Sequence, residues 1–395
     1  MSIFRGQHIA NMHDAVSLQR ISLETMAQET EIGLGKKGRI AYGLDDISIV
    51  PSRRTRDPQD VSTSWQVDAY EFDIPVIGAP MDSVTSPQTA IAMGKLGTLG
   101  VLDLEGLWTR YDDPEPILTK ISQLDQSEVT AYLQEAYAEP IKPELIVQRL
   151  HEIRDAGVTV AGALSPQRTQ QYYSTVLNAG VDLFVIRGTS VSAEHVSEDH
   201  EPLNLKQFIY DLDVPVIVGG AANYRAALHL MRAGAAGVLV GFGGVATSAN
   251  RRTIGVSIPM ATAISDVAEA RRDYMDESGG RYVQVIADGS MGSSGSFVTA
   301  LAMGADAAML GAPLARAVEA PGHGTHWGSE ARHATLPRGF RTTVGTVGTL
   351  EEILYGPSHN ADGTTNFTGA LRRAMASCGY VDIKSFQRCP VVVNR

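Results

Sequence analysis

The sequence is poor in cysteine and has no long apolar run. Two cysteines, Cys378 and Cys389, occur in 395 residues. So few cysteines argue against a disulfide framework or a structural zinc site and are typical of a reducing cytosol. No apolar stretch approaches the ~20 residues that span a bilayer, and the N-terminus lacks the charged-then-apolar pattern of a signal peptide. We therefore expect a cytoplasmic protein without a membrane partner.

The sequence also lacks an excess of positive charge. Acidic residues outnumber lysine and arginine by 44 to 33, which gives a net charge of −11 at pH 7. A protein that binds nucleic acid irrespective of base sequence needs basic residues to contact the phosphates. The composition therefore argues against a nucleic-acid partner.

What the sequence does contain is an alternation of short apolar runs with amphipathic or alanine-rich segments. Continuous apolar strands that alternate with helices indicate a parallel sheet covered on both faces. Eight such runs predict an α/β fold, a closed (β/α)8 TIM barrel. An open doubly wound sheet is the alternative, but no run is followed by a complete G-x-G-x-x-G with an acidic residue about 20 positions on. The runs are residues 74–81, 98–104, 158–164, 182–188, 215–220, 238–241, 283–289 and 307–311.

The predicted barrel occupies residues 41–395 and follows a polar N-terminal arm, residues 1–40, in which residues 36–38 resemble a turn. Two segments interrupt the alternation of apolar runs with amphipathic segments. Residues 105–145 are rich in Asp, Glu, Gln and Pro, and we expect a partly helical excursion after strand two, with a substrate lid as the alternative. Residues 318–369 follow strand eight, so we expect them to lie over the C-terminal mouth as a mobile flap.

Three loops are candidates for a ligand site. Residues 237–260 contain a short strand and then Gly241-Phe242-Gly243-Gly244, which is either a tight turn or a place where the backbone approaches a ligand. The loops after strands seven and eight, residues 287–295 and 310–313, often hold phosphate in this fold. Their glycines leave backbone N–H groups free to converge on an anion. Asp288 is placed either to accept hydrogen bonds from a ribose diol or to cap the next helix.

Further motifs complete a pattern. They are residues 78–85 (Gly-Ala-Pro-Met-Asp-Ser-Val-Thr), Gly-Val-Ser-Ile-Pro at the end of the 241–259 loop, and Ala287-Asp288-Gly289 followed by Ser294-Gly295. Together with residues 42–51 and 369–375, they resemble the IMP dehydrogenase/GMP reductase family from about Tyr42 onward. The chain is most similar to the IMP-dehydrogenase-related subgroup that lacks the CBS module and the catalytic cysteine, because residues 105–145 are too short for that module.

The resemblance implies a purine nucleoside monophosphate (IMP, GMP or XMP) as ligand and NAD or NADP as cofactor. In the family, a loop cysteine attacks C2 of the purine and a hydride passes to or from the cofactor. The thiolate serves as both nucleophile and leaving group. Alignment without gaps puts Ser248 at the cysteine position and Asn250 at the position of the threonine that assists water or ammonia chemistry. Ser248 and Asn250 are therefore the implied catalytic residues.

The resemblance also implies the remaining site residues. The nucleotide would contact Met81, Asp288, Gly289, Ser290, Gly311 and Ala312, and the cofactor would contact Arg187, Gly188, Thr189, Gly241 and Gly243. Arg187 replaces an acidic residue of the family, and we expect it either to bind a phosphate or carboxylate or to form a salt bridge at the barrel rim. A potassium ion would contact the backbone carbonyls of Gly243, Val245 and Ser248. Family members form tetramers, so a homotetramer is implied.

Two main functions stay open at this point. The first is an oxidoreductase of this family with nicotinamide-linked chemistry. The second is a non-catalytic barrel that binds purine nucleotides and has a regulatory role, because a serine hydroxyl is a far weaker nucleophile than a thiolate unless a base activates it. No histidine lies in the loop that carries Ser248. A barrel that acts on another sugar phosphate is a third and weaker possibility.

Overall fold

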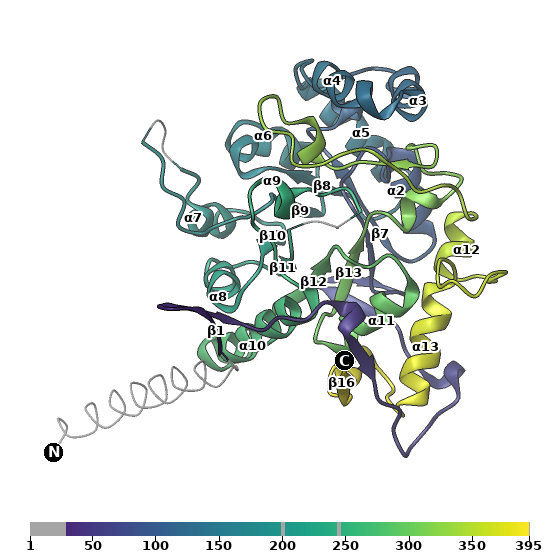
Figure 1. Cartoon of the computed structure of the whole chain (residues 1–395). Helices are drawn as coiled ribbons and strands as arrows, with labels where there is room; N and C mark the ends of the chain where they lie inside the picture. The colour runs from purple at the N-terminus through teal and green to yellow at the C-terminus, as the bar shows by residue number, and fades with distance from the viewer. Residues whose placement is uncertain (1–28, 199–201, 243–245, 395) are drawn as a thin grey trace. The chain divides into compact units, whose positions relative to one another are not determined.

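The computed structural model describes residues 29–198, 202–242 and 246–394 (Figure 1). The chain divides into two units, with the boundary between Tyr42 and Gly43. In the first unit, β1 (Glu29–Gly33) and β2 (Lys36–Arg39) pair antiparallel. The turn expected at residues 36–38 is wrong, because these residues continue β2 and the chain reverses at Leu34 and Gly35. Gly35 supplies the left-handed φ of 79° that this reversal needs. Residues 1–28 of the predicted arm lie outside the described residues.

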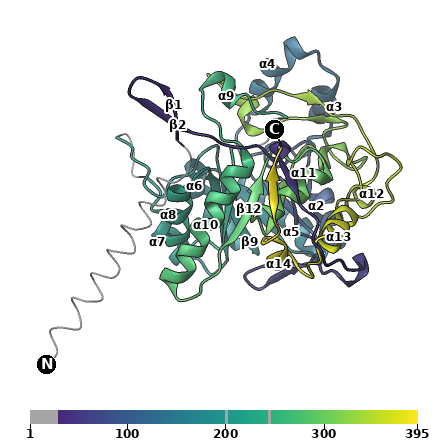
Figure 2. The ribbon, with the colours of Figure 1, turned by 60° about the horizontal axis from the view of Figure 1, so that its bottom comes forward.

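Eight parallel strands close into a barrel in the second unit (Figure 1 and Figure 2). Each strand pairs with the next strand in the chain, and β13 pairs with β6 to close the ring. The predicted (β/α)8 barrel is confirmed, and the open doubly wound sheet is excluded. The strands are β6 (Val76–Gly78), β7 (Leu99–Asp103), β8 (Ala161–Leu164), β9 (Leu183–Arg187), β10 (Val216–Ala221), β11 (Gly237–Val240), β12 (Gln284–Asp288) and β13 (Ala307–Leu310).

The barrel strands are buried on both faces, which explains their continuous apolar sequences. Every residue of β8, β10, β11, β12 and β13 is buried. Phe184, Ile217 and Ile286 have no exposed surface at all. Burial of one such side chain stabilises the fold by about 1.5–3 kcal/mol, so the strands contribute a large share of the hydrophobic stabilisation.

Helices pack around the outside of the barrel, and local signals set where several of them begin (Figure 2). The side chains of Ser86, Asn223 and Ser293 accept backbone N–H groups at the starts of three helices. A proline in the first turn begins four of the described α-helices. The main helices that lie largely outside residues 105–145 are α2 (Pro87–Lys95), α5 (Pro143–Asp155), α6 (Pro166–Asn178), α7 (Leu205–Tyr210), α8 (Tyr224–Arg232), α10 (Met260–Ser278), α11 (Ser294–Ala302) and α13 (Phe367–Ser377).

Residues 105–145, called the acidic segment below, form a partly helical excursion, as the sequence predicts. The segment contains η3 (Leu107–Thr109), α3 (Glu115–Gln123) and α4 (Gln126–Ala136), and it leads into α5. Leu118, Ile121, Val129 and Leu133 are fully buried. The two helices therefore pack through an apolar face in spite of their acidic composition.

Residues 318–369, called the flap below, contain little regular structure. In this segment β14 (Thr325–His326) pairs with β15 (Thr342–Thr343), and η5 (Ser329–Arg332) and α12 (Leu350–Leu354) are short. Because α13 begins at Phe367, the irregular segment ends at Asn366 rather than at residue 369. The mobility of the flap stays a prediction.

The remaining elements are short and flank the barrel. Strand β16 (Val391–Val393) pairs antiparallel with β3 (Ile47–Ile49), and β4 (Trp65–Val67) forms a hairpin with β5 (Tyr70–Phe72). Within the described ranges, no helix combines the length and the apolar composition needed to cross a membrane. The other short helices are η1 (Leu44–Asp46), η2 (Pro58–Asp60), α9 (Asn250–Thr253), η4 (Leu314–Arg316) and α14 (Ile383–Phe386).

Candidate functional site

A cavity of about 280 Å³ lies at the carboxyl ends of the barrel strands. Its walls come from the loops after β6, β12 and β13, from Asp45 in η1, from Ala246 in the loop after β11 and from His326 in β14. The tertiary structure thus brings together every residue that the sequence assigns to a nucleotide, and their role in binding stays a prediction. These residues are Met81, Asp288, Gly289, Ser290, Gly311 and Ala312.

The loops after β12 and β13 present backbone donors to this cavity. In the part of the chain that the structure describes, the N–H groups of Ser290, Met291, Gly292, Gly311 and Ala312 donate no hydrogen bond. Ser290 has a left-handed φ of 62°, directly after Gly289 at 112°. Successive N–H groups in turns of this type form concave sites for anions. The loops therefore have the donors that a phosphate group needs.

Asp288 is paired with Arg187 across the mouth. Arg187 Nε donates to Asp288 Oδ2 over 2.9 Å, and a second guanidinium nitrogen donates to Oδ1 over 3.3 Å. The side chains are only 11% and 6% exposed. Burial alone would lower the pKa of Arg187, but the charge and hydrogen bonds of Asp288 raise it above its ordinary value. Of the two expectations for Arg187, the structure shows the salt bridge. Asp288 does not cap α11, because Ser293 does so.

The other residues assigned to a cofactor lie at the ends of β9 and β11. Gly188 exchanges backbone hydrogen bonds with the β10 strand, so its N–H and carbonyl are both occupied. Thr189 Oγ1 lies 3.5 Å from Oε1 of Glu330, a flap carboxylate that is only 7% exposed and that the sequence did not single out. A side chain at Gly241 would overlap the Asp288 backbone. Gly243, which was assigned to both the cofactor and the cation, lies outside the described residues.

Ser248 and Asn250 follow β11, at the place where the chain after that strand contacts the flap. The Ser248 hydroxyl accepts the Asn250 N–H over 3.3 Å, and Ser248 forms a backbone bridge to Gly339. Asn250 is 3% exposed, and its Oδ1 accepts a hydrogen bond from Arg338 Nε over 3.2 Å. In the described ranges, no imidazole or carboxylate hydrogen-bonds to Ser248. Val245, the third residue assigned to the cation, lies outside those ranges, so the cation site stays a prediction.

His326 is a cavity residue that the sequence analysis missed. Its Nδ1 lies 2.9 Å from the Ser83 hydroxyl, and a side chain at Gly311 would come within 3.1 Å of its ring. The residue is 3% exposed. Burial, helped by the positive charge of Arg187, lowers the pKa of His326 from 6.5 to about 4. The ring is therefore neutral at pH 7. A histidine does reach the mouth, but from the flap rather than from the loop that carries Ser248.

The buried neutral state of His326 predicts sensitivity to acid. Because its pKa is about 4 in the folded protein against 6.5 ordinarily, the stability that depends on the neutral ring is complete above about pH 6.5 and is lost as the pH falls toward 4. Over this range, the free energy of unfolding of His326→Gln should fall by less than that of the unchanged protein, and the difference should reach up to about 3 kcal/mol. Urea unfolding from pH 7 to 4.5 measures the difference, with His151→Gln at an exposed position as the control. Equal losses in all three proteins would contradict the buried neutral ring.

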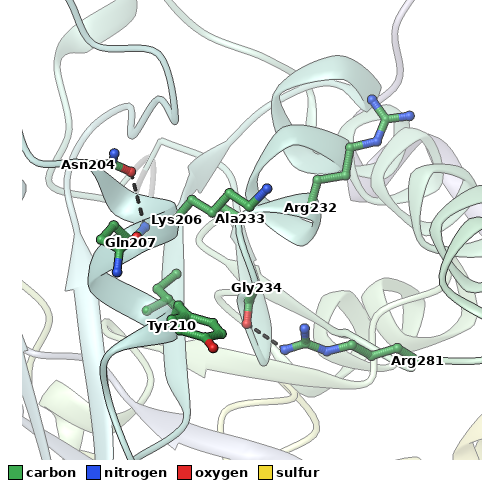
Figure 3. Close-up of a pocket in the computed structure, with 9 residues that line it drawn as sticks. Asn204, Lys206, Gln207, Tyr210, Arg232, Ala233, Gly234 and Arg281 are labelled. Carbon is green, nitrogen blue, oxygen red and sulfur yellow. Dashed lines mark hydrogen bonds between the residues drawn. The ribbon is translucent and has the colours of Figure 1, made fainter.

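A second cavity, of about 560 Å³, lies between α7 and α8, near the residues that precede the strands (Figure 3). It contains Lys206, Arg232 and Arg281. Arg232 is bound by Glu277 through two hydrogen bonds, and Arg281 donates to the Gly234 carbonyl over 2.6 Å. In a (β/α)8 barrel, residues at the amino-terminal ends of the strands usually serve stability, whereas active sites form at the carboxyl ends. We therefore place the candidate site at the mouth, although its cavity is the smaller one.

The fold and the mouth cavity together define a (β/α)8 barrel protein with a cavity at the carboxyl ends of its strands that is lined by glycine-containing loops and Asp288. The model of the "IMP dehydrogenase / GMP reductase domain" matches residues 41–340. The chain therefore belongs to the IMP dehydrogenase/GMP reductase family, as the motifs of the sequence predict.

Relatives and a solved structure agree with this family. An "Uncharacterized oxidoreductase" of Mycolicibacterium smegmatis is 50% identical over 92% of this chain and 99% of the relative. An inosine-5'-monophosphate dehydrogenase of Methanocaldococcus jannaschii is 23% identical over 88% of this chain and 91% of that protein. The crystal structure of an IMP dehydrogenase/GMP reductase-like protein from Corynebacterium glutamicum has a TM-score of 0.89 and 49% identity, and it covers 95% of this chain and 100% of its own.

Proposed function

We propose that the mouth cavity binds a purine nucleoside monophosphate, IMP, GMP or XMP. The observation that carries the proposal is the set of backbone N–H groups at residues 290–292 and 311–312 that have no partner among the described residues and lie in the same cavity as Asp288. The N–H groups suit the phosphate, and the Asp288 carboxylate suits the ribose diol. Family membership supports the purine as the base.

We further propose that the protein is an oxidoreductase that uses NAD or NADP. When bound, such a cofactor supplies hydride transfer, while the protein supplies binding and orientation. The residues at the strand ends fit this cofactor only in part, because Arg187 is occupied by Asp288 and the Gly188 backbone is occupied by β10. Thr189 and Glu330 are the groups that stay available to it. A homotetramer and a cytoplasmic location belong to the same proposal.

A non-catalytic, nucleotide-binding role is the second candidate, and one observation favours it. The Ser248 hydroxyl accepts the backbone N–H of Asn250 and has no base beside it in the described ranges. A hydroxyl in this state is a poor nucleophile. The experiment is calorimetric titration with IMP, GMP and XMP, followed by an absorbance assay at the reduced-nicotinamide band with NAD and with NADP. Turnover supports the oxidoreductase, binding without turnover supports the regulatory role, and absence of binding contradicts both.

The Ser248 position offers a sharper test of the chemistry. We expect Ser248→Cys to raise the nicotinamide-linked rate at least about tenfold, because a thiolate is a far stronger nucleophile and a better leaving group than a hydroxyl. Ser248→Ala is the matched control, and we expect it to abolish the rate while nucleotide affinity changes less than about twofold. A Ser248→Ala protein with the full rate would exclude the hydroxyl as the reacting group.

A further inference from the structure

The acidic segment contacts the flap at several points along its length. These contacts join α3, α4 and the loops beside them to residues on both sides of β14. Arg341 donates to the carbonyls of Ile121 and Ser122 at the end of α3 over 3.0 and 3.1 Å. Gln134 of α4 donates to the carbonyls of His333 and Ala334. The flap is therefore attached to the acidic segment through side-chain and backbone groups, and Figure 1 shows the two side by side.

Tyr137 forms a further contact that is buried, with 9% of its surface exposed. It immediately follows α4. Its hydroxyl donates to Asp82 Oδ2 over 2.5 Å and accepts the indole N–H of Trp327 over 3.0 Å. The guanidinium of Arg332 lies 4.2 Å from the centre of its ring. One hydroxyl thus joins the acidic segment, the loop after β6 and the flap.

The two residues that this hydroxyl joins are direct neighbours of cavity residues. Asp82 follows Met81, and Trp327 follows His326, while both Met81 and His326 line the mouth cavity. Ser83 strengthens the link, because its hydroxyl lies 2.9 Å from His326 Nδ1 and also accepts the Trp327 N–H over 3.3 Å. A change at Tyr137 therefore reaches two walls of the cavity, because each of its hydrogen-bond partners is the sequence neighbour of a residue that lines the cavity.

Charged groups surround this contact. Asp82 is 2% exposed and its Oδ1 has no partner in the described residues, while Arg332 donates to Asp103 Oδ2 over 3.2 Å and to the Glu105 carbonyl over 2.6 Å. Burial raises the pKa of Asp82, and it raises the pKa of Asp103 to about 7, although Arg332 opposes both shifts. Buried carboxylates of this kind need every partner that they have. Loss of the Tyr137 hydroxyl would therefore disturb the whole contact.

We propose that the acidic segment is the docking site of the flap and that Tyr137 is a positioning residue for the mouth cavity. The hydroxyl holds Met81 and His326 in place by fixing the residue next to each. The Tyr137 hydroxyl bonds Asp82 and Trp327 and not the loops after β12 and β13, so we expect the phosphate donors of those loops to keep their positions when it is lost. The docking contact itself does not depend on the proposed function, whereas its effect on nucleotide affinity rests on it.

Tyr137→Phe tests the proposal, because it removes one hydroxyl and keeps the ring under Arg332. We expect hydrogen exchange of residues 323–333 to accelerate about tenfold, while exchange in β10 to β13 is unchanged. We expect IMP to bind about tenfold more weakly and ribose 5-phosphate to bind with unchanged affinity. Uniform weakening of both ligands is what a merely structural role would produce. Tyr132→Phe is the control, since Tyr132 lies on α4 and its hydroxyl forms no hydrogen bond in the described residues.

Two further results decide the proposal if Tyr137→Phe does not fold or if the unchanged protein binds no nucleotide. Gln134→Ala removes a partly exposed contact to the flap carbonyls and should accelerate exchange at residues 330–336 without unfolding the barrel. The exchange measurement needs no ligand, so it separates failure of the docking contact from failure of the proposed function. Unchanged flap exchange in both variants would overturn the proposal.

Discussion

Replacement of Arg187 by methionine is expected to lower the free energy of unfolding by about 3–5 kcal/mol while strengthening mononucleotide binding. Stability falls because the Asp288 carboxylate, 6% exposed, loses its charged partner. Binding strengthens because Arg187 now occupies both carboxylate oxygens, at 2.9 and 3.3 Å, that a ribose diol would contact. Urea unfolding measures the first effect, and calorimetric titration with IMP, GMP and XMP measures the second.

Asp288→Asn is the matched variant on the other side of the pair. It should cost a similar amount of stability, because the Arg187 guanidinium, whose side chain is 11% exposed, loses its counter-charge. Unlike Arg187→Met, it should weaken mononucleotide binding about 10- to 100-fold, since an amide is a poorer acceptor for two hydroxyl groups than a carboxylate. Equal weakening by the two substitutions would show that Arg187 contacts the nucleotide instead of competing with it.

Replacement of Asp306 by asparagine is expected to lower the free energy of unfolding by about 3–5 kcal/mol and to leave mononucleotide binding unchanged. Asp306 precedes β13, at the strand end opposite the mouth, and it is 3% exposed. Its Oδ2 accepts from Arg271 over 2.5 Å and from the Val285 N–H over 2.7 Å. Its Oδ1 accepts from Tyr282 over 2.6 Å and from Gln387 over 2.9 Å. One carboxylate therefore holds together α10, β12 and the C-terminal region.

Urea unfolding and calorimetry on Asp306→Asn separate a structural ion pair from the pair at the mouth. Tyr282→Phe is a milder companion that removes one of the four hydrogen bonds, and it should cost about 1–3 kcal/mol because the acceptor is charged. The residues that surround Asp306 do not line the mouth cavity. If Asp306→Asn weakened nucleotide binding while the barrel stayed folded, the assignment of the two barrel ends to stability and to binding would be wrong.

The barrel could be predicted from the sequence because its signal is local. A buried parallel strand needs an apolar run, and a glycine or a polar residue marks its end, so each of the eight runs identified one strand. The limits were less accurate. The run at residues 74–81 contains β6 only over Val76–Gly78, and Met81 belongs to the loop that lines the cavity. Apolar composition alone does not tell a strand from the buried loop that follows it.

The flap side of the site could not be predicted, because nothing local marks it. His326, Glu330 and Trp327 lie in a segment without apolar periodicity. Their burial depends on packing against residues that are far away in the sequence, such as Ser83 and Tyr137, which are 243 and 190 residues away from His326 and Trp327. The available signal was the abundance of glycine and histidine in the segment after strand eight. It predicted a flap but did not indicate which of its side chains enter the site.

The sequence by itself determined the order of strands and helices, the family, and the glycine-rich loops whose backbone can approach an anion, since each depends on residues close together in the chain. The tertiary structure alone decided which charges meet. Arg187 and Asp288 are 101 residues apart, and they pair because barrel closure places the ends of β9 and β12 at the same mouth. The charge of Arg187 was compatible with both a ligand contact and a salt bridge. Only the tertiary structure showed a buried carboxylate beside it, which lowers the cost of desolvating the arginine.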